Sequence, residues 1–377
     1  MQYRTLDQAA LRGKRVLLRA GFDVPVEEGN VVDTERIEAI LPTMRFILDA
    51  GASLIIMAHQ GRPKGGGFEA EFSQKPLVPV LEKLLGAPVA FAPSCAGPDT
   101  LALALSLEPG HVLLLENLRF HAGEKKNDPS FSKELAELGD LYVNDAFPNM
   151  HRDDASMVGV PTLLPAFMGL RLAEEVGHLS QVLDDPRRPL TVLIGGAKME
   201  TKIPVISAFL ACADNILVGG AVANTFIAAR GFSVGRSKYE PEFVPKVREC
   251  MANVHIPRDA VVAGAPMDAS VRLDLPLEDV GGDVSILDIG KISVEHYVTM
   301  VKKSGMVVWN TLRLAEAIAH ATRERGVVSI VGGGDTLDAH RRYGLSLAAY
   351  SFVSTGGGAM LEFLSGKKFH ALEALSL

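Results

Sequence analysis

The chain has 377 residues, of which 47% are hydrophobic and 22% are charged, and its formal net charge is −7. This length exceeds one ordinary core and predicts two domains of about 150 to 200 residues each. The negative charge argues against a general nucleic-acid binder or a binder of anionic membranes. Without a signal-peptide core or a run of about 18 apolar residues, we expect a cytoplasmic protein that does not span a membrane.

Four strands are predicted in the first half of the chain, at residues 15–23, 53–62, 111–121 and 140–147. Short β-branched runs that alternate with helix-period segments are typical of βαβ units on a parallel sheet. In such a sheet, ligands bind beyond the carboxyl ends of the strands.

Charged or imidazole side chains follow all four of these strands. They are Asp23, Arg36, His59, Arg62, Arg119, His121, His151 and Arg152. A single arginine at a strand end is usually a solvated surface residue, but four successive strands with this ending favour a shared site. Because a guanidinium keeps its charge and pairs with phosphate or carboxylate oxygens, the cluster predicts an anion site.

A helix is predicted between the two halves of the chain, because apolar residues recur there at helical spacing before two prolines. The apolar residues are Leu172, Val176, Leu179 and Leu183, and the prolines are Pro186 and Pro189. We interpret 166–186 as a hinge helix between a domain at 1–165 and a second at 187–361. The alternative is a crossover helix inside one large sheet.

Four strands in the second half end in glycine, at residues 190–198, 215–222, 327–335 and 350–358. Tight strand-to-helix turns use glycine anyway, so one such loop is weak support for a ligand. Four of them favour a nucleotide, since glycine allows close backbone approach and the following helix directs N–H groups at phosphate. Between these strands, residues 233–296 predict one helix at 240–252 and short strands.

Two charged residues accompany the glycine loops. Lys198 supplies a mobile positive charge, and Asp335 offers a hard oxygen for Mg²⁺, although it can also cap a helix. Neither a Walker P-loop nor an early GxGxxG motif is present. An arginine-lined anion site and a glycine-lined nucleotide site together predict phosphoryl transfer in a closing cleft.

Long segments of the sequence resemble the phosphoglycerate kinase family, in the same order and spacing. They are "GFDVPVEEGNVVDTERIEAILPT", "AHQGRPKGG", "LLLENLRFHAGEKKNDPSF", "LYVNDAF", "HRDDAS", "IGGAKMETKI", "IVGGGDT" and "STGGGAMLEFLSGK". The resemblance implies an α/β fold of two doubly wound, Rossmann-like domains, with a C-terminal tail, 362–377, that packs on the first. It also implies reversible phosphoryl transfer between 1,3-bisphosphoglycerate and MgADP, which gives 3-phosphoglycerate and MgATP.

The resemblance also assigns roles to individual residues. The catalytic residues would be Arg36 and Lys198. Substrate would be bound by Asp23, Arg36, His59, Arg62, Arg119 and Arg152. Nucleotide would be bound by Lys198, Lys202, Gly219, Gly220, Asn310, Gly333, Gly334, Asp335, Thr336, Gly356 and Gly357, with Asp335 as the metal ligand. The expected partners are these small molecules, and we expect a monomer that binds no nucleic acid.

The sequence departs from the family pattern in four places. Gly21 and Thr201 each stand where the family usually has an aspartate, and Pro148 stands where it has a glycine. After Asn310 a family loop of roughly fourteen residues, which carries a ribose-binding glutamate, has no counterpart. Either the loop is deleted, or it is too mobile to be seen and the numbering closes over it.

These departures leave two alternatives to an active kinase. One is a catalytically weak paralogue that binds nucleotide or phosphoglycerate without efficient turnover, which the lost glutamate favours and intact Arg36 and Lys198 oppose. The other is a nicotinamide-dependent dehydrogenase on a similar scaffold. It has little support, since "AHQGRPKG" is basic where a dinucleotide site needs an acidic residue.

Overall fold

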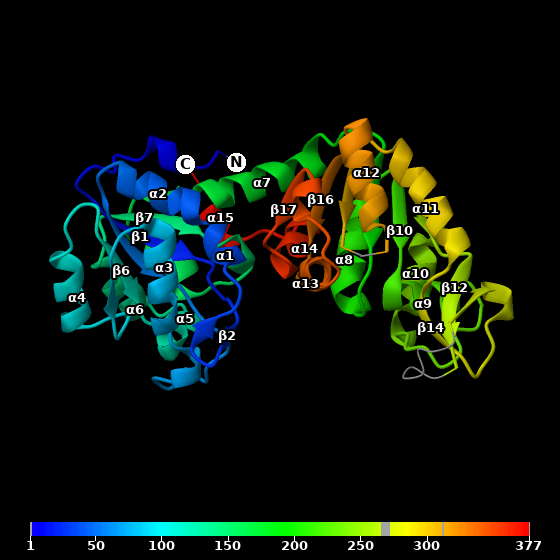
Figure 1. Cartoon of the computed structure of the whole chain (residues 1–377), viewed down its shortest axis with the longest axis horizontal. Coiled ribbons are helices and arrows are strands. Elements are labelled where there is room, and N and C mark those ends of the chain that lie inside the picture. The colour runs from blue at the N-terminus through cyan, green and yellow to red at the C-terminus, as the bar shows by residue number, and fades with distance from the viewer. Residues whose placement is uncertain (1, 265–271, 311–312, 377) are drawn as a thin grey trace. The chain divides into compact units, whose positions relative to one another are not determined.

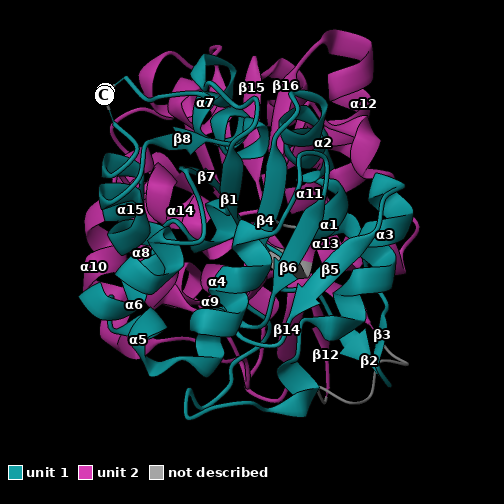
Figure 2. Ribbon diagram, turned by 90° about the vertical axis from the view of Figure 1, so that its left-hand side faces the viewer, with its two compact units in different colours: residues 1–177, 368–377 teal, residues 178–367 magenta. Residues whose placement is uncertain are grey.

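The computed structural model describes residues 2–264, 272–310 and 313–376. The chain forms two compact units, one of residues 1–177 with 368–377 and one of residues 178–367 (Figure 2). The division between the units falls inside one helix, and residues 362–367 belong to the second unit. The domain limits expected from sequence, 1–165 with the tail 362–377, a hinge helix at 166–186 and 187–361, stay a prediction. That this helix acts as a hinge stays a prediction.

The first unit is built on a six-stranded parallel sheet in the order β5-β6-β4-β1-β7-β8. Its strands are β1 (Arg15–Ala20), β4 (Ser53–Met57), β5 (Val89–Ala92), β6 (Val112–Leu115), β7 (Leu141–Asp145) and β8 (Ala166–Met168). The central strands are buried along nearly their whole length, because helices cover both faces of a parallel sheet and each strand is a continuous apolar run.

Helices follow the strands of the first unit in the alternating pattern of βαβ units. They are α1 (Glu35–Glu38), α2 (Leu41–Asp49), α3 (Val78–Leu85), α4 (Pro98–Leu105), α5 (Ala122–Lys125), α6 (Pro129–Ala136) and α7 (Leu170–Asp184). Ile37, Met44 and Leu81, from the first three helices, share one core cluster with Leu18, Leu54 and other strand residues. A short hairpin joins β2 (Val26–Glu27) to β3 (Asn30–Val31).

The C-terminal residues complete the first unit. Helix α15 (His370–Glu373) lies there, and the imidazole of His370 is 3.0 Å from the carboxylate of Asp153. The backbone N–H of Arg4 also donates to the carbonyl of Leu375 at 3.3 Å. Segments from the two ends of the chain therefore lie side by side in this unit.

The second unit contains a six-stranded parallel sheet in the order β11-β10-β9-β15-β16-β17 (Figure 1). Its strands are β9 (Leu190–Ile194), β10 (Asn215–Val218), β11 (Val254–His255), β15 (Met306–Trp309), β16 (Val328–Gly332) and β17 (Phe352–Ser354). The chain runs outward from β9 to β11 and then returns to β15 on the other side of β9. The strand order therefore reverses between β9 and β15, which is where such sheets bind ligands.

Seven α-helices begin and end within the second unit and pack around this sheet, as far as the described residues show. They are α8 (Met199–Phe209), α9 (Gly220–Ala229), α10 (Val244–Cys250), α11 (Lys291–Lys303), α12 (Ala315–Arg325), α13 (Gly334–Arg342) and α14 (Gly358–Leu364). Tyr297 of α11 and Ile318 of α12 pack with Val307 and Trp309 of β15 in one core cluster. A small antiparallel sheet adds β12 (Asp259–Ala263), β13 (Leu273–Pro276) and β14 (Ser285–Ile289).

The predicted fold class is confirmed, but the predicted elements were wrong in detail. All eight predicted strands exist, yet each ends earlier than expected; for example, 15–23 is a strand only to Ala20. Strands β5 and β8 were missed, because runs as short as "VAFA" and "AFM" carry little periodicity. The helix expected at 240–252 is an α-helix only over Val244–Cys250. In the described residues no helix is both long and apolar enough to cross a membrane.

Candidate functional site

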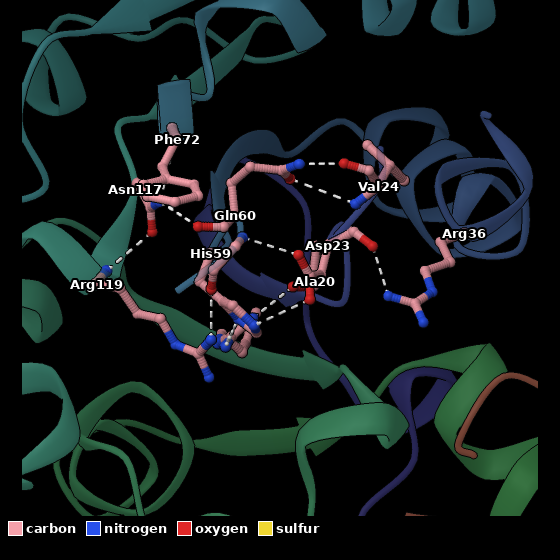
Figure 3. Close-up of polar contacts among 11 residues, drawn as sticks. Ala20, Asp23, Val24, Arg36, His59, Gln60, Phe72, Asn117 and Arg119 are labelled. Carbon is pink, nitrogen blue, oxygen red and sulfur yellow. Dashed lines mark hydrogen bonds and ion pairs between the residues drawn. The ribbon is translucent and has the colours of Figure 1, made fainter. Parts of the chain in front are cut away.

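Two buried amides hold together the loops that follow β1, β4 and β6 at the carboxyl edge of the first sheet. Asn117 donates to the carbonyl of Gln60 at 2.7 Å and to that of Phe72 at 2.8 Å. The amide of Gln60 in turn bonds to both the N–H and the carbonyl of Val24 (Figure 3). These hydrogen bonds therefore join three loops that are distant in sequence, and so hold their side chains in place.

Arg19 fixes the protonation state of His59. Its guanidinium is fully buried, and Nη2 lies 2.9 Å from Nδ1 of His59, which is 1% exposed. Because a guanidinium only donates, Nδ1 must accept and the proton of the neutral imidazole must be on Nε2. Nε2 lies 3.9 Å from the Asp23 carboxylate, so His59 presents an N–H donor at the sheet edge.

A group of arginines surrounds His59. Burial lowers the pKa of His59 well below its usual value, and positive charges on four arginines lower it further. In order of effect these are Arg19, Arg119, Arg152 and Arg36. The structure thus brings together His59 and three of the arginines expected to bind substrate, and the imidazole stays uncharged among them.

Arg119 and Arg152 carry buried donors that have no hydrogen-bond partner among the described residues. Arg119 is 3% exposed and Nη1 donates to the carbonyl of Gly61 at 2.7 Å, but its Nε and Nη2 are unpaired, as is Nε of Arg152. Burial, with Arg152 second, lowers the pKa of Arg119 to about 10, although Asp154 opposes the shift. Since unpaired buried donors are costly, these atoms are suited to an oxyanion.

Asp23 and Arg36 lie on the other side of this group (Figure 3). The carboxylate of Asp23 accepts a hydrogen bond from the N–H of Gly61 at 2.9 Å, and its carbonyl accepts one from Nη1 of Arg36. Arg36, in the short helix α1, is half-buried and holds its remaining guanidinium nitrogens without a partner among the described contacts. Both residues lie where the sequence predicted a substrate site.

Arg62 differs from the other predicted substrate residues. It is exposed, and it is not among the arginines that shift the pKa of His59. It follows Gly61, whose φ of +60° and position against Phe72 require glycine, since a Cβ there would lie 2.3 Å from the ring. The structure thus places Arg62 at the rim of the arginine group around His59, and Arg62 takes no part in the hydrogen bonds of that group.

Two of the sequence departures are neighbours in the structure. A Cβ at Gly21 would lie 3.6 Å from Cδ of Pro148 and 3.6 Å from Cα of Ala146, which is ordinary van der Waals contact. The two departures therefore lie in contact, and the backbone at position 21 has room for a Cβ.

The strand ends of the second unit meet at the point where the strand order reverses. Asn310, after β15, accepts a hydrogen bond from the N–H of Gly195, after β9, at 2.8 Å. Gly220, with φ of +58°, approaches the backbone of Gly196 so closely that a Cβ would lie 3.3 Å from its nitrogen. Gly219 is the N-cap of α9, so the two predicted glycines open a helix here.

Two more glycine loops open helices at this edge. Gly333, with φ of +109°, is the N-cap of α13, and a Cβ there would lie 3.7 Å from Cβ of Asn310. Gly357, with φ of +48°, follows buried Gly356 and is the N-cap of α14. Thr336 is 5% exposed in the first turn of α13. The side chains of Gly334 and Asp335, including the expected metal ligand, lie outside the described residues.

The two predicted nucleotide lysines lie at the start of α8. Lys198 is the N-cap residue of this helix and is exposed. Lys202, one turn later, lies over the glycine loop, since a Cβ at Gly196 would be 3.3 Å from its Cε. Thr201 donates to the carbonyl of Lys198 at 3.1 Å and so caps its own turn. The family loop that has no counterpart in this chain would follow Asn310, at residues 311–312, which lie outside the described residues.

Sequence reasoning missed the residues that organise the first site. Arg19, Gln60 and Asn117 bind no expected ligand, and their partners lie far away in sequence. A signal for Arg19 was present, because an arginine inside the apolar strand "RVLLRA" must be buried and paired. No comparable sequence pattern marks Gln60 or Asn117.

The chain is similar to one protein family over almost its whole length. The family model described as phosphoglycerate kinase matches residues 6–367. A phosphoglycerate kinase of Azorhizobium caulinodans is 41% identical over 394 residues, which cover 99% of this chain and 99% of that protein. One from Rhodospirillum centenum is 38% identical over 396 residues and covers all of both chains.

A solved structure of phosphoglycerate kinase from Coxiella burnetii is similar in fold, with a TM-score of 0.88, 35% identity and 99% coverage of both chains. The alignments with the relatives above span 394 and 396 residues against the 377 of this chain. Those proteins therefore have residues that this chain lacks, in agreement with a shortened loop.

Proposed function

This chain belongs to the phosphoglycerate kinase family, and from that premise we propose that it transfers a phosphoryl group reversibly between 1,3-bisphosphoglycerate and MgADP, giving 3-phosphoglycerate and MgATP. The protein is accordingly an α/β phosphotransferase with a carboxyl group as acceptor. We also propose that it acts as a cytoplasmic monomer.

One observation supports the phosphoglycerate half of this proposal most strongly. Three buried guanidinium nitrogens, on Arg119 and Arg152, lack partners among the described residues, beside an imidazole that is held neutral. A phosphate and a carboxylate on one small molecule supply the acceptors that these donors need. A neutral ligand would leave the positive charges around His59 without compensation.

The residues of the first unit have separate roles in this proposal. Arg119 and Arg152 bind the nontransferable phosphate of the substrate, and the N–H on Nε2 of His59 with the Asp23 carboxylate orients the glycerate. Arg36, which Asp23 fixes through its carbonyl, neutralises charge on the moving phosphoryl group. Arg62 lies at the rim and attracts the anion.

The residues of the second unit bind the nucleotide. Backbone N–H groups at the starts of α9, α13 and α14 face phosphate, and Lys198 follows the transferred group because its side chain is exposed and mobile. A carboxylate such as that of Asp335 is the ligand type that would hold a magnesium ion supplied with the nucleotide, and the ion would neutralise phosphate charge.

No general base is required for this reaction. The acceptor is already an anionic carboxylate or phosphate, so catalysis needs positioning and charge neutralisation. The experiment that tests the proposal is ATP-dependent phosphorylation of 3-phosphoglycerate, with glycerate as a control that lacks the phosphate. We expect turnover with the first compound only. Equal turnover with glycerate, or none with either, would refute the assigned substrate.

A further inference from the structure

A cavity of about 650 Å³ lies in the second unit, away from the glycine loops. It is lined where helices end and strands begin, by Leu210 after α8, Ile216 in β10 and Phe232 after α9. This is the amino edge of the sheet, whereas the glycine loops lie at its carboxyl edge. The volume is in the range of small-ligand sites.

One wall of this cavity is cationic. Arg230, Arg258, His255 and His296 line it. The two imidazole rings have centroids 6.0 Å apart, and Arg258 is near enough to lower the pKa of both histidines, although burial is the larger cause for each. Four nitrogen-rich side chains therefore converge on one space.

These cationic groups have no carboxylate of their own. No hydrogen bond or ion pair joins the guanidinium of Arg230 or Arg258 to any described residue. Two acidic residues also line the cavity, but Asp214 already accepts from Arg188 at 3.0 Å and from the N–H of Leu190 at 2.6 Å, which leaves only exposed Glu278. The formal charges of the two arginines and the two acidic residues in the lining cancel, but the pairing of Asp214 with Arg188 leaves the two arginines without a carboxylate partner among the described residues.

Hydrogen bonds hold the backbone that carries Arg258 and His255. The N–H of Arg258 donates to Oγ of Ser293 at 2.8 Å, and its carbonyl accepts from the N–H of Leu277 at 3.2 Å. The carbonyl of His255 accepts from the hydroxyl of Tyr297 at 2.8 Å. Such a frame keeps the donors in place without occupying them.

Apolar side chains line the cavity beside the nitrogen-rich ones. They are Leu210, Ile216, Phe232, Ile256 and Leu277, and Ile216 is 1% exposed while Leu277 is 3% exposed. A ligand that fits this mixed lining carries an anionic group and an apolar body. Inorganic phosphate alone would leave the apolar side chains in contact with water.

We propose that this cavity binds a small organic anion, whose phosphate or carboxylate group pairs with Arg230 and Arg258 and accepts hydrogen bonds from His255 and His296. Its apolar part lies against Phe232 and Ile256. The site is separate from both sites assigned to phosphoryl transfer, and the proposal does not depend on that function.

Histidine NMR spectra of the full chain test this proposal directly. The protein contains ten histidines, and those at 255 and 296 are assigned with His255→Gln and His296→Gln variants. We expect phenyl phosphate to shift both resonances in a saturable way and to raise both pKa values, so that affinity increases as pH falls from 8 to 6. The charged groups that line the cavity with the pair are Arg230, Arg258, Asp214 and Glu278.

Matched probes and variants separate the possible outcomes. Benzoate binding in place of phenyl phosphate would identify a carboxylate ligand, whereas inorganic phosphate should bind at least about tenfold more weakly than phenyl phosphate. Arg258→Ala should weaken binding at least about tenfold, Arg258→Lys should weaken it less, and Arg62→Ala in the other unit should have no effect. An unshifted resonance of His340, a buried histidine of the same unit that does not line the cavity, shows that the fold of Arg258→Ala is intact.

Three results would overturn the proposal. One is a phenyl phosphate titration that shifts other histidines and leaves those at 255 and 296 unchanged. Another is binding of phenol as tight as that of phenyl phosphate, which would show that the anionic group is not recognised. The third is an Arg258→Ala variant that binds as the parent protein does.

Discussion

His59 shows how one buried contact determines the chemistry of a residue. An imidazole at a substrate site is normally assigned either as a cation or as a proton carrier. Here Arg19 occupies Nδ1 at 2.9 Å, and burial with nearby arginines lowers the pKa of His59 well below its usual value. The residue is therefore a neutral N–H donor, and the positive charge of the site comes from arginine alone.

This assignment gives a first prediction. Ring nitrogen NMR of labelled protein should show His59 neutral, with its proton on Nε2, at pH 6, where an ordinary histidine is largely charged. In Arg19→Gln the pKa of His59 should rise, because a nearby charge and an obligatory donor are removed. A His59 that titrates near 6.5 in the parent protein would contradict the contact.

The second prediction separates the two ligands by residue. Lys198→Ala should reduce kcat by about 100-fold or more and leave the Kd of 3-phosphoglycerate nearly unchanged, because Lys198 belongs to the nucleotide loops. Arg62→Ala should instead weaken 3-phosphoglycerate binding first. Lys303→Ala, a change at an exposed lysine of α11, is the control and should alter neither value. If both variants changed the same binding constant, the assignment of one ligand to each unit would be wrong.

Sequence alone predicted the charged residues of the candidate site and missed the residues that hold them in place. Arg36, Arg119 and Arg152 were predicted because arginines after successive parallel strands meet at one edge. Gln60 and Asn117 were not predictable, because their amides donate to the carbonyls of Val24 and Phe72, which only the folded chain brings near. In general, tertiary contacts decide which side-chain amides hold the loops of a site together.

At the scale of elements, strand ends were the weakest part of the sequence prediction. Residues such as Asp23 and Arg62 were counted within the predicted strands, although Gly21 and Gly61 precede them. In the structure both residues lie beyond the ends of their strands, and Asp23 bonds to the N–H of Gly61 in another loop. The misplaced ends are therefore the loops of the candidate site, and the sheets themselves were predictable from their apolar runs.

Helix α7 supports a prediction about pH. Asp145, at the end of β7, is 1% exposed and accepts from the N–H of Leu172 at 2.7 Å in the first turn of α7. Burial is the main cause that raises the pKa of Asp145 to about 7. Because the pKa is raised in the folded state, protonated Asp145 adds to the free energy of unfolding. This contribution is complete below the unfolded pKa, near 3.8, and is lost as pH rises through 7.

Replacement with asparagine should remove this dependence. Asp145→Asn keeps an acceptor for the N–H of Leu172 and cannot ionise. Between pH 4 and pH 8, its free energy of unfolding, measured by denaturation, should therefore rise by roughly 4 kcal/mol relative to that of the parent, at 1.36 kcal/mol per pKa unit. Asp140→Asn, at a partly exposed residue paired with Arg15, should be less stable than the parent above pH 4, and this difference should shrink as pH falls below 3.8, since Arg15 lowers the pKa of Asp140. If the difference in unfolding free energy between the parent and Asp145→Asn did not vary with pH, a buried, titrating carboxyl group would be contradicted.

At the scale of the whole molecule, each unit has its own sheet, core and ligand edge. Transfer requires the two ligands to meet, so we predict that the molecule closes when both are bound. Small-angle scattering should show a smaller radius of gyration with MgADP and 3-phosphoglycerate together than with either alone. Identical radii in all three states would contradict a hinge at α7.

The account rests on an active phosphoryl-transfer enzyme that works without the family loop after Asn310. The most direct test is a coupled assay of ATP-dependent 3-phosphoglycerate phosphorylation on protein whose intact mass has been measured. We predict turnover from a protein of 40.3 kDa, the mass of this sequence. Turnover only from a heavier protein would mean that the loop exists. A 40.3 kDa protein that binds both ligands and turns over neither would contradict the proposed function.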